Sequence, residues 1–492
     1  MNTVGTTSPP ASALADPATS ATPVLRIAFL PFYVSYYEGV CSTFPAEKQE
    51  VAARAADRLG AVGEVLWDGQ LLADADAAAQ RGSALATQRP DVVVVLTTIA
   101  VFGSLPLAAL DRLPGVPVII WNAQQLRTVD DGYSMVDIVR NTGQIGTQAL
   151  ANTLLRRGRW FHVVSGHEGS TDALGHLGRL ARVAAVAGAV RRARLLCVGE
   201  PFPGMTDVEL DDEALASTIG TTVTRVGSEQ FNVCHAAVTA EAVEVEASDA
   251  RGRHPVDPSL STDALRRSAR ISVALQALVA THDADGGSIN CHGGNCLQNP
   301  RIGVTACYAI GVQNRRGRPF TCTGDLPTAL AMLLVKRLTG AAMYTEVQVA
   351  DERRGAVVIA NSGEGEPAIG RPGHPQTLRG NTNFAGLHGR GASFAYPLAA
   401  GPATLVSLTP TPAGPRAWRL IVAEGEILND VLPDAGALAG FFRFAHASLD
   451  EGYRTWMGSG AVHHAATTVG HWAEDLRGVA DLLQMEFVEV RK

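Results

Sequence analysis

The sequence contains no long apolar run and no concentration of basic residues, and both absences exclude classes of function. The longest apolar stretches, such as DVVVVLTTIAVFG, are shorter than the ~20 residues that a membrane-spanning helix needs, or are broken by Arg and Gly. The net charge is -7, and Lys and Arg form no long runs. The charge pattern of a nucleic-acid-binding protein is therefore missing. We expect a small molecule as ligand, and neither a membrane nor a nucleic acid as partner.

Signals for export and for nucleotide binding are also missing. Residues 1–24 are mainly Ala, Ser, Thr and Pro, without the basic start and apolar core of a secretory signal, so we expect a disordered tail there. Neither G-x-G-x-x-G nor G-x-x-x-x-G-K-[ST] occurs. The 7 cysteines form an odd set, and several lie in apolar segments, where a free thiol packs as a small hydrophobe. These features favour the reducing cytoplasm.

The chain is long enough for several hydrophobic cores. It has 492 residues, 46% of them hydrophobic, whereas single cores stop growing at roughly 250–300 residues. From Leu25, short β-branched runs alternate with amphipathic segments, a pattern typical of parallel sheets covered by helices. Beyond residue 340, short strands separated by Gly, Pro and Asn predict an antiparallel barrel or sandwich.

We therefore predict an α/β fold with two doubly wound domains and a C-terminal antiparallel, barrel-like domain. The predicted boundaries are 25–155 for the first α/β domain, 156–340 for the second, which opens with the strand WFHVVSG, and 341–492 for the barrel-like domain with its closing helix.

The segment GAVHHAATTVGHWAEDL places three histidines, His463, His464 and His471, around a loop that leads into a helix. Small neighbours allow a ligand to approach, and histidine is a common metal ligand. A structural role for one member of the adjacent pair and solvent exposure for the other is an equally good interpretation.

Two carboxylates are further candidates. Asp325, in CTGDLPTALAML, precedes Pro327 at the start of a predicted helix, so a helix cap is its simplest role. Glu346 lies in a short strand between apolar neighbours; pointing inward it would need a cation or a proton, but an edge position facing solvent is as compatible with the pattern.

Several loops carry polar residues that a ligand could contact. Asn361 lies in a Gly-rich turn that is also a normal hairpin. His388 and Arg390, in FAGLHGRGASF, could bind an anion or sugar hydroxyls, although a surface turn is the commoner explanation. His167 follows a strand and precedes a helix, where open α/β sheets bind ligands.

The segment CHGGNC, with Cys291, His292 and Cys296, suggests a zinc cluster only weakly. A C-x4-C spacing without a second pair of ligands is insufficient. Zinc is therefore not predicted from this segment.

These segments, in this order, resemble the L-arabinose isomerase and L-fucose isomerase superfamily over nearly the whole chain from about Leu25. The most specific matches are CTGDLPTALAML, GRGASFAYPLAAGPATLVSL and GAVHHAATTVGHWAEDL. The resemblance implies two Rossmann-like domains and a C-terminal β-barrel-like domain. It also implies a homo-oligomer, a tetramer or hexamer.

The resemblance further implies a metal-dependent aldose–ketose isomerase that acts on a sugar through an ene-diolate. The cation is usually Mn2+, with Co2+ or Mg2+ as alternatives, because a hard cation binds neighbouring sugar oxygens. His464 matches the histidine ligand, since its spacing to His471 fits the family's H-x6-H pattern. Glu346 matches an acidic ligand that also moves the proton, and a further histidine of arabinose isomerases falls near Asn361.

The chain departs from the family at the position of one expected ligand. Where a second glutamate is usual, the motif reads T-G-D, with Thr323 at the glutamate position and Asp325 at the motif's aspartate. Three interpretations follow: Asp325 completes a metal and catalytic site with Glu346 and His464; the fold performs related chemistry on another polyol or keto sugar; or the protein binds sugars without catalysis.

Overall fold

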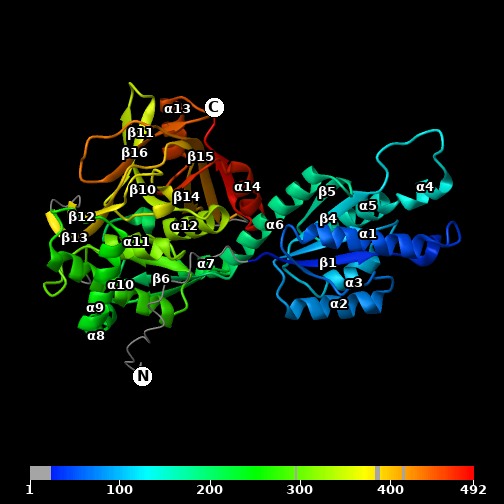
Figure 1. Ribbon diagram of the computed structural model, residues 1–492, viewed down its shortest axis with the longest axis horizontal. Coiled ribbons are helices and arrows are strands. Elements are labelled where there is room, and N and C mark those ends of the chain that lie inside the picture. The colour runs from blue at the N-terminus through cyan, green and yellow to red at the C-terminus, as the bar shows by residue number, and fades with distance from the viewer. Residues whose placement is uncertain (1–23, 294–295, 383–387, 413–415, 492) are drawn as a thin grey trace. The chain divides into compact units, whose positions relative to one another are not determined.

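A computed structural model describes residues 24–293, 296–382, 388–412 and 416–491 (Figure 1). The described chain divides into two compact units, here called the N-terminal unit, which ends at Gly188, and the C-terminal unit, which begins at Ala189. The tail predicted over residues 1–24 lies outside the described residues except for Val24. Within the described ranges, no helix combines the length and apolar composition that crossing a bilayer requires.

A parallel sheet with strand order β2-β1-β3-β4-β5 forms the centre of the N-terminal unit. Its strands are β1 (Arg26–Phe32), β2 (Glu64–Leu66), β3 (Val92–Thr97), β4 (Val118–Gln124) and β5 (Phe161–His167). The connecting helices are η2 (Ser35–Tyr37), α1 (Phe44–Leu59), α2 (Ala75–Thr87), α3 (Ser104–Leu110), α4 (Met135–Arg140) and α5 (Gly143–Arg156), and α6 (Thr171–Arg191) follows β5. β3 reads VVVVLT and is buried at every position, as a central strand of a parallel sheet should be.

Strand β5 belongs to this first sheet, which corrects one prediction. The sequence pattern predicts that WFHVVSG opens the second domain at residue 156. In the structure, β5 pairs in parallel with β4 along its whole length, from Phe161 opposite Val118 to His167 opposite Gln124. The helix α5 supplies the crossover that two parallel neighbours require. The composition of a strand indicates how buried it is but not which strand it pairs with. The predicted domain boundary at residue 156 therefore lies one strand too early.

The C-terminal unit begins with a second parallel sheet, with strand order β7-β6-β8-β9. Its strands are β6 (Arg194–Val198), β7 (Thr222–Val226), β8 (Gly286–Ile289) and β9 (Phe320–Cys322). The helices of this part are η3 (Thr206–Val208), α7 (Asp212–Thr218), α8 (Ser228–Ala237), α9 (Ala240–Arg253), α10 (Thr262–Thr281), α11 (Cys307–Arg315) and α12 (Leu326–Thr339).

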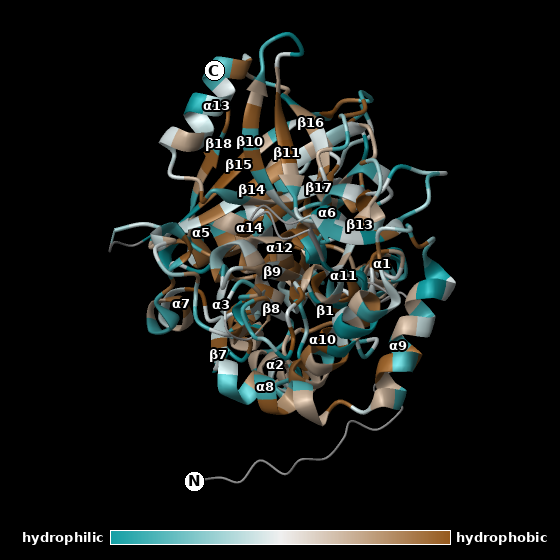
Figure 2. Ribbon diagram, turned by 90° about the vertical axis from the view of Figure 1, so that its left-hand side faces the viewer, coloured by the Kyte–Doolittle hydropathy of each residue, from teal (hydrophilic) through white to brown (hydrophobic). Residues whose placement is uncertain are grey.

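An antiparallel barrel follows, closed by pairing of β14, β17, β10, β11, β16 and β15 in that order, with β15 returning to β14. The strands are β10 (Met343–Asp351), β11 (Ala356–Asn361), β14 (Gly401–Pro410), β15 (Trp418–Ile427), β16 (Leu438–Phe444) and β17 (His464–Val469), and β18 (Glu486–Glu489) adds in parallel to β15. Also present are η4 (Pro367–Ile369), the hairpin β12 (Thr377–Thr382) and β13 (His388–Ala395), and the helices α13 (Leu449–Gly458) and α14 (Ala473–Leu482). β11 reads AVVIAN and is buried at every position (Figure 2).

The predicted α/β organisation with parallel sheets and a C-terminal antiparallel barrel is thus confirmed. Helix α12 joins its two parts within the C-terminal unit. It contacts β8 and β9 of the parallel sheet and β14 and β17 of the barrel, and every residue from Leu326 to Val335 is buried. The start of α12 therefore lies where the end of the parallel sheet meets the first residues of β17.

Candidate functional site

The turn between β9 and α12 positions the first carboxylate. Thr323 and Gly324 both have positive φ angles, 62° and 84°, so the chain reverses sharply before Asp325. A Cβ on Gly324 would lie 2.6 Å from the Cα of Pro201, which only glycine avoids. Asp325 then caps α12, because its Oδ1 accepts the N–H of Thr328 at 2.9 Å. The predicted helix cap is confirmed.

The other carboxylate oxygen of Asp325 holds His464, the first residue of β17. His464 Nδ1 lies 2.8 Å from Asp325 Oδ2, and the two residues are 2% and 0% exposed. Burial lowers the pKa of His464, but its contacts with Asp325 and Glu346 outweigh that effect and raise the pKa to about 9. With Nδ1 bound to a carboxylate, Nε2 is the nitrogen left to act on a ligand.

Glu346 approaches that second nitrogen. The pairing of β10 with β17 places Glu346 opposite His464, and Glu346 Oε1 lies 3.7 Å from His464 Nε2. Gln348 donates to Oε2 of the same carboxylate at 3.2 Å. Burial raises the pKa of Glu346, but the contacts with His464 and Gln348 prevail and lower it below its usual value. The side chain is 30% exposed, so this carboxylate is ionised and reachable.

The rings of Tyr344 and His463 flank His464, with centroids at 4.4 Å and 3.7 Å. His463 is bound differently from its neighbour: its backbone N–H and its Nδ1 both contact Asp207 Oδ2, at 3.1 Å and 2.6 Å. Of the two adjacent histidines, His463 is therefore the half-exposed one, and Asp207 holds its side chain in place. His464 is the buried member of the pair.

A group of sulfur and nitrogen donors lies on the same edge of the parallel sheet. Cys291 follows β8, Cys322 ends β9, and their sulfur atoms are 3.2 Å apart. One donor atom each from Cys291, His292 and Cys322 lies within 4.8 Å of the other two. We call these three residues the Cys–His group. The CHGGNC motif contains Cys291 and His292, but the third member of the group is Cys322 and not Cys296 of the motif.

Cys322 was missed although a signal for it was present. Strands β8 and β9 are parallel neighbours, with Ile289 opposite Cys322, so the residues that follow β8 lie beside the end of β9. The hydrogen bond with Cys291, together with the hydrogen bond and charge of His292, lowers the pKa of Cys322 well below its usual value. The contact that stabilises this thiolate correspondingly raises the pKa of Cys291.

Glu364 is a further buried carboxyl that sequence patterns assigned to a hairpin turn. It is 3% exposed, and its Oε1 accepts from the thiol of Cys307 at 3.2 Å. Its Oε2 has no hydrogen-bond partner among the described residues. Burial, followed by the negative charge of Cys322, raises the pKa of Glu364 to about 7.

Asn361, predicted as a substrate contact, holds the loop that carries Glu364. Its Nδ2 donates to the carbonyl of Tyr344 at 2.6 Å, and its Oδ1 accepts the N–H of Gly363 at 2.8 Å. Gly363 has a φ of 103°, and a Cβ there would meet Ser393 at 2.5 Å. The amide of Asn361 thus binds the backbone of this turn, and its contact with a substrate stays a prediction.

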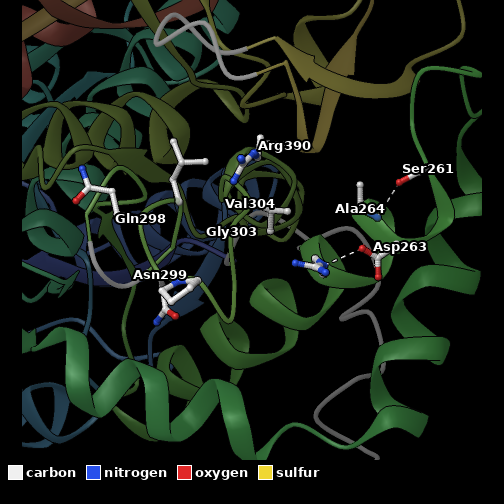
Figure 3. Close-up of a pocket in the computed structure, with 11 residues that line it drawn as sticks. Ser261, Asp263, Ala264, Gln298, Asn299, Gly303, Val304 and Arg390 are labelled. Carbon is white, nitrogen blue, oxygen red and sulfur yellow. Dashed lines mark hydrogen bonds and ion pairs between the residues drawn. The ribbon is translucent and has the colours of Figure 1, made fainter.

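Arg390 lies at a different place in the C-terminal unit. It is exposed at the start of β13 and lines a cavity of about 360 Å3 together with Asp263 and Arg267 from α10 (Figure 3). Asp325, Glu346 and His464 do not line this cavity. His388 begins β13, but its side chain lies outside the described part of the chain.

His167 lies in the N-terminal unit, at the end of β5. Its Nε2 contacts the carbonyl of Gln125 at 3.1 Å, and its Nδ1 accepts the N–H of Gly169 at 2.9 Å. Both ring nitrogens thus bind backbone atoms of neighbouring loops. His167 was predicted as a substrate contact, and these bonds give it a structural role.

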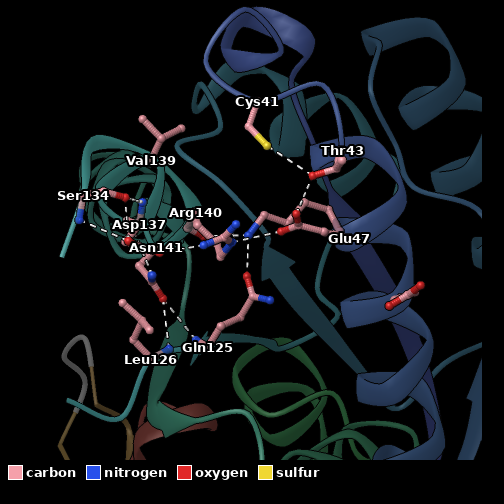
Figure 4. A network of polar contacts seen from close by, with 12 residues as sticks. Cys41, Thr43, Glu47, Gln125, Leu126, Ser134, Asp137, Val139, Arg140 and Asn141 are labelled. Atoms are coloured by element: carbon pink, nitrogen blue, oxygen red, sulfur yellow. Dashed lines mark hydrogen bonds and ion pairs between the residues drawn. The ribbon is translucent and has the colours of Figure 1, made fainter. Parts of the chain in front are cut away.

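Near the same sheet edge, the N-terminal unit contains a polar network around a buried lysine (Figure 4). Lys48 is fully buried, and its Nζ donates to Gln125 Oε1 at 2.5 Å and to the Arg140 carbonyl at 2.6 Å. Arg140 in turn binds Glu47 at 2.9 Å and Asp137 at 2.6 Å. Burial lowers the pKa of Lys48 to about 8. Because both ends of this network are satisfied by protein groups, we assign it to the stability of the unit.

No protein-family model and no curated protein matches this chain. A function for this chain is therefore inferred from the arrangement of Asp325, His464 and Glu346, while the isomerase resemblance stays a prediction from the sequence.

Proposed function

We propose that this protein is a metal-dependent sugar isomerase-like enzyme that interconverts an aldose and a ketose by proton transfer. The observation that carries the proposal is the aligned series Asp325–His464–Glu346. A fully buried carboxylate orients one histidine nitrogen, and the other nitrogen faces an ionised, reachable carboxylate. Such an arrangement combines a ligand pair for a divalent cation with a proton carrier.

The donor atoms fit a shared cation. Two ligands that bind one ion at about 2.1–2.2 Å and subtend 90–120° at it are separated by about 3.0–3.8 Å, and the Nε2–Oε1 separation here is 3.7 Å. His464 and Glu346 would therefore hold Mn2+, or Co2+ or Mg2+, with sugar and water oxygens as further ligands. When bound, the cation would polarise the sugar's neighbouring oxygens.

Asp325 takes a different role from the one predicted. Thr328 and His464 each bind one of its two oxygens, and the side chain is fully buried, so this carboxylate is held where it orients the histidine. We assign it as the positioning residue behind His464, a partner typical of metal-ligating histidines.

Glu346 is the residue proposed to move the proton. Its pKa lies below the usual value, so it is a carboxylate at neutral pH and accepts a proton from the carbon next to the carbonyl. Returning that proton to the former carbonyl carbon, while the proton of the adjacent hydroxyl moves to the former carbonyl oxygen, converts aldose to ketose. The rings of Tyr344 and His463 lie against that of His464, tilted by 40° and 42°, and limit its movement.

Thr323 supports a second candidate function, related chemistry on a different polyol or keto sugar. Its hydroxyl donates to the carbonyl of Cys322 at 2.7 Å, so it supplies neither a charge nor a free donor where the family has a glutamate. With a single carboxylate at the cation, the reaction is restricted to substrates that need one proton carrier. Sugar binding without catalysis is the third outcome of the test below.

The test is a turnover screen with purified protein loaded with Mn2+, Co2+ or Mg2+, using aldoses, ketoses and their phosphates. Glu346→Gln should abolish turnover while preserving the fold, and Glu352→Gln, on the exposed turn after β10, is the matched control. Absence of turnover and of bound cation in the wild-type protein would refute the proposal. Saturable sugar binding without turnover would establish the non-catalytic alternative.

We further propose that both parallel-sheet parts are Rossmann-like, that the protein works in the cytoplasm, and that it assembles as a tetramer or hexamer. The free state of Cys41, Cys197, Cys234, Cys291, Cys296, Cys307 and Cys322 supports a reducing compartment. The assembly follows from the family resemblance, and analytical ultracentrifugation tests it.

A further inference from the structure

We propose that Cys291, His292 and Cys322 bind a thiophilic divalent cation, zinc foremost, in a site whose donors are distinct from the Glu346–His464 pair. This site does not depend on isomerase chemistry. The proposal depends instead on the three donor side chains that lie together at one edge of the parallel sheet.

The fold brings the three residues together and holds them in place. Cys322 ends β9 beside Ile289, the last residue of β8, so Cys291 and His292 emerge next to it. Asn290 fixes that emerging loop: its Nδ2 donates to the Glu200 carbonyl at 2.7 Å and its Oδ1 accepts the His292 N–H at 3.1 Å. The donors are therefore preorganised on rigid strand ends.

The distances match a tetrahedral zinc site better than a disulfide. With Zn–S bonds of about 2.3 Å, two thiolates on one zinc lie about 3.8 Å apart. The observed separation of the two sulfurs is 3.2 Å, so metal binding requires an opening of about 0.6 Å. A disulfide, with its bond near 2.05 Å, would require a closure of about 1.2 Å.

A second observation points to a ligand here. Glu364 is 3% exposed, its Oε2 has no partner within the described residues, and Cys322 and His292 are both close enough to interact with it electrostatically. A buried oxygen without a partner is costly unless an ion or a proton satisfies it. Glu364 is therefore a second buried group near these donors that a bound cation would stabilise.

The donor set selects the metal. Thiolates favour zinc over the hard cations manganese and magnesium, which prefer oxygen. Cys291 and Cys322 are 1% and 4% exposed, so both sulfur donors are shielded from solvent. The buried sulfur pair favours a structural role for the metal, and His292 also interacts electrostatically with Glu346 of the proposed catalytic pair.

The test uses the full-length protein with Zn2+ and with Co2+ as a spectroscopic probe. We expect one tightly held zinc per chain, and a thiolate-to-cobalt charge-transfer band in the cobalt form. Cys291→Ser and Cys322→Ser should weaken binding by at least about tenfold, since even indirect partners of metal ligands contribute 10–100-fold. Cys296→Ser, a buried cysteine on the same loop and outside the group, is the matched control and should bind normally.

Three outcomes would overturn the site: no stoichiometric zinc in the wild-type protein, a cobalt spectrum without the thiolate band, or equal loss in Cys296→Ser. A Cys291–Cys322 disulfide in protein kept from air would overturn it in favour of a redox pair. The cobalt spectrum of the wild-type protein decides the question even if the serine variants do not fold. Glu346→Gln should keep the thiolate band, which separates failure of this site from failure of the proposed isomerase.

Discussion

Replacing Asp325 by Asn should destabilise the metal-free protein at low pH and should cost little at high pH. His464 is 2% exposed and has a pKa raised from 6.5 to about 9. At about 1.36 kcal/mol per pH unit, that shift is worth roughly 3 kcal/mol. A raised pKa stabilises the folded state fully below pH 6.5 and loses its effect as pH rises through about 9. The variant removes the anion nearest to His464 but keeps an oxygen that can accept the Thr328 N–H.

The assay is urea unfolding of the chelator-treated protein at pH 6 and pH 9.5, followed by hydrogen-exchange mass spectrometry of peptides from β17, which reports on the C-terminal unit alone. Asp211→Asn is the matched control, because Asp211 is an exposed aspartate that caps α7 through Glu213 and Ala214. It should change stability by less than about 0.5 kcal/mol. A pH-independent loss in Asp325→Asn, or a loss no larger than in the control, would refute the proposed charge pairing. In the metal-loaded protein, the same variant should lower Mn2+ affinity by about 10–100-fold.

Three further predictions follow. The buried Lys48 has a pKa lowered from 10.5 to about 8, so the stability of the N-terminal unit should rise between pH 8 and 10.5. Lys48→Met should remove that rise in denaturation curves. A pH profile of stability that is the same in the variant would contradict the lowered pKa of Lys48. Gly324→Ala should lower the melting temperature more than Gly340→Ala, because both residues have a φ of 84° but only Gly324 faces backbone at 2.6 Å; equal effects would contradict the steric argument. Thr323→Glu should increase isomerisation of arabinose- or fucose-like sugars in steady-state assays if the missing carboxylate alone limits the reaction, and no gain would show that the pocket itself differs.

Local sequence patterns predicted the helices and strands themselves better than they predicted which strands pair. The runs VVVVLT and VIIWNA read as buried strands and are strands β3 and β4, because β-branched runs express burial in a parallel sheet. Short strands with Gly and Pro between them likewise predicted the barrel. The assignment of β5 failed since its pairing with β4 is a long-range property that its own composition does not express.

In the candidate site, too, local features were predicted and long-range contacts were not. Asp325 was expected both as a helix cap and at the metal; the cap is confirmed, and its second oxygen binds His464, 139 residues away. Cys322 escaped notice because it joins Cys291 only through the adjacency of β8 and β9. Glu364 looked like part of an ordinary turn, and no local pattern reports that such a carboxyl is buried.

The most direct test of the central claim is solvent deuterium incorporation into sugar by the Mn2+-loaded protein. Glu346 is proposed to remove a proton from the carbon beside the carbonyl and to return it to the former carbonyl carbon. The wild-type protein should therefore introduce deuterium at the carbon that receives the proton, measurable by NMR. Glu346→Gln should abolish the incorporation, while Glu352→Gln should leave it unchanged. Incorporation that persists in Glu346→Gln, or none with any aldose or ketose in the wild-type protein, would contradict the account.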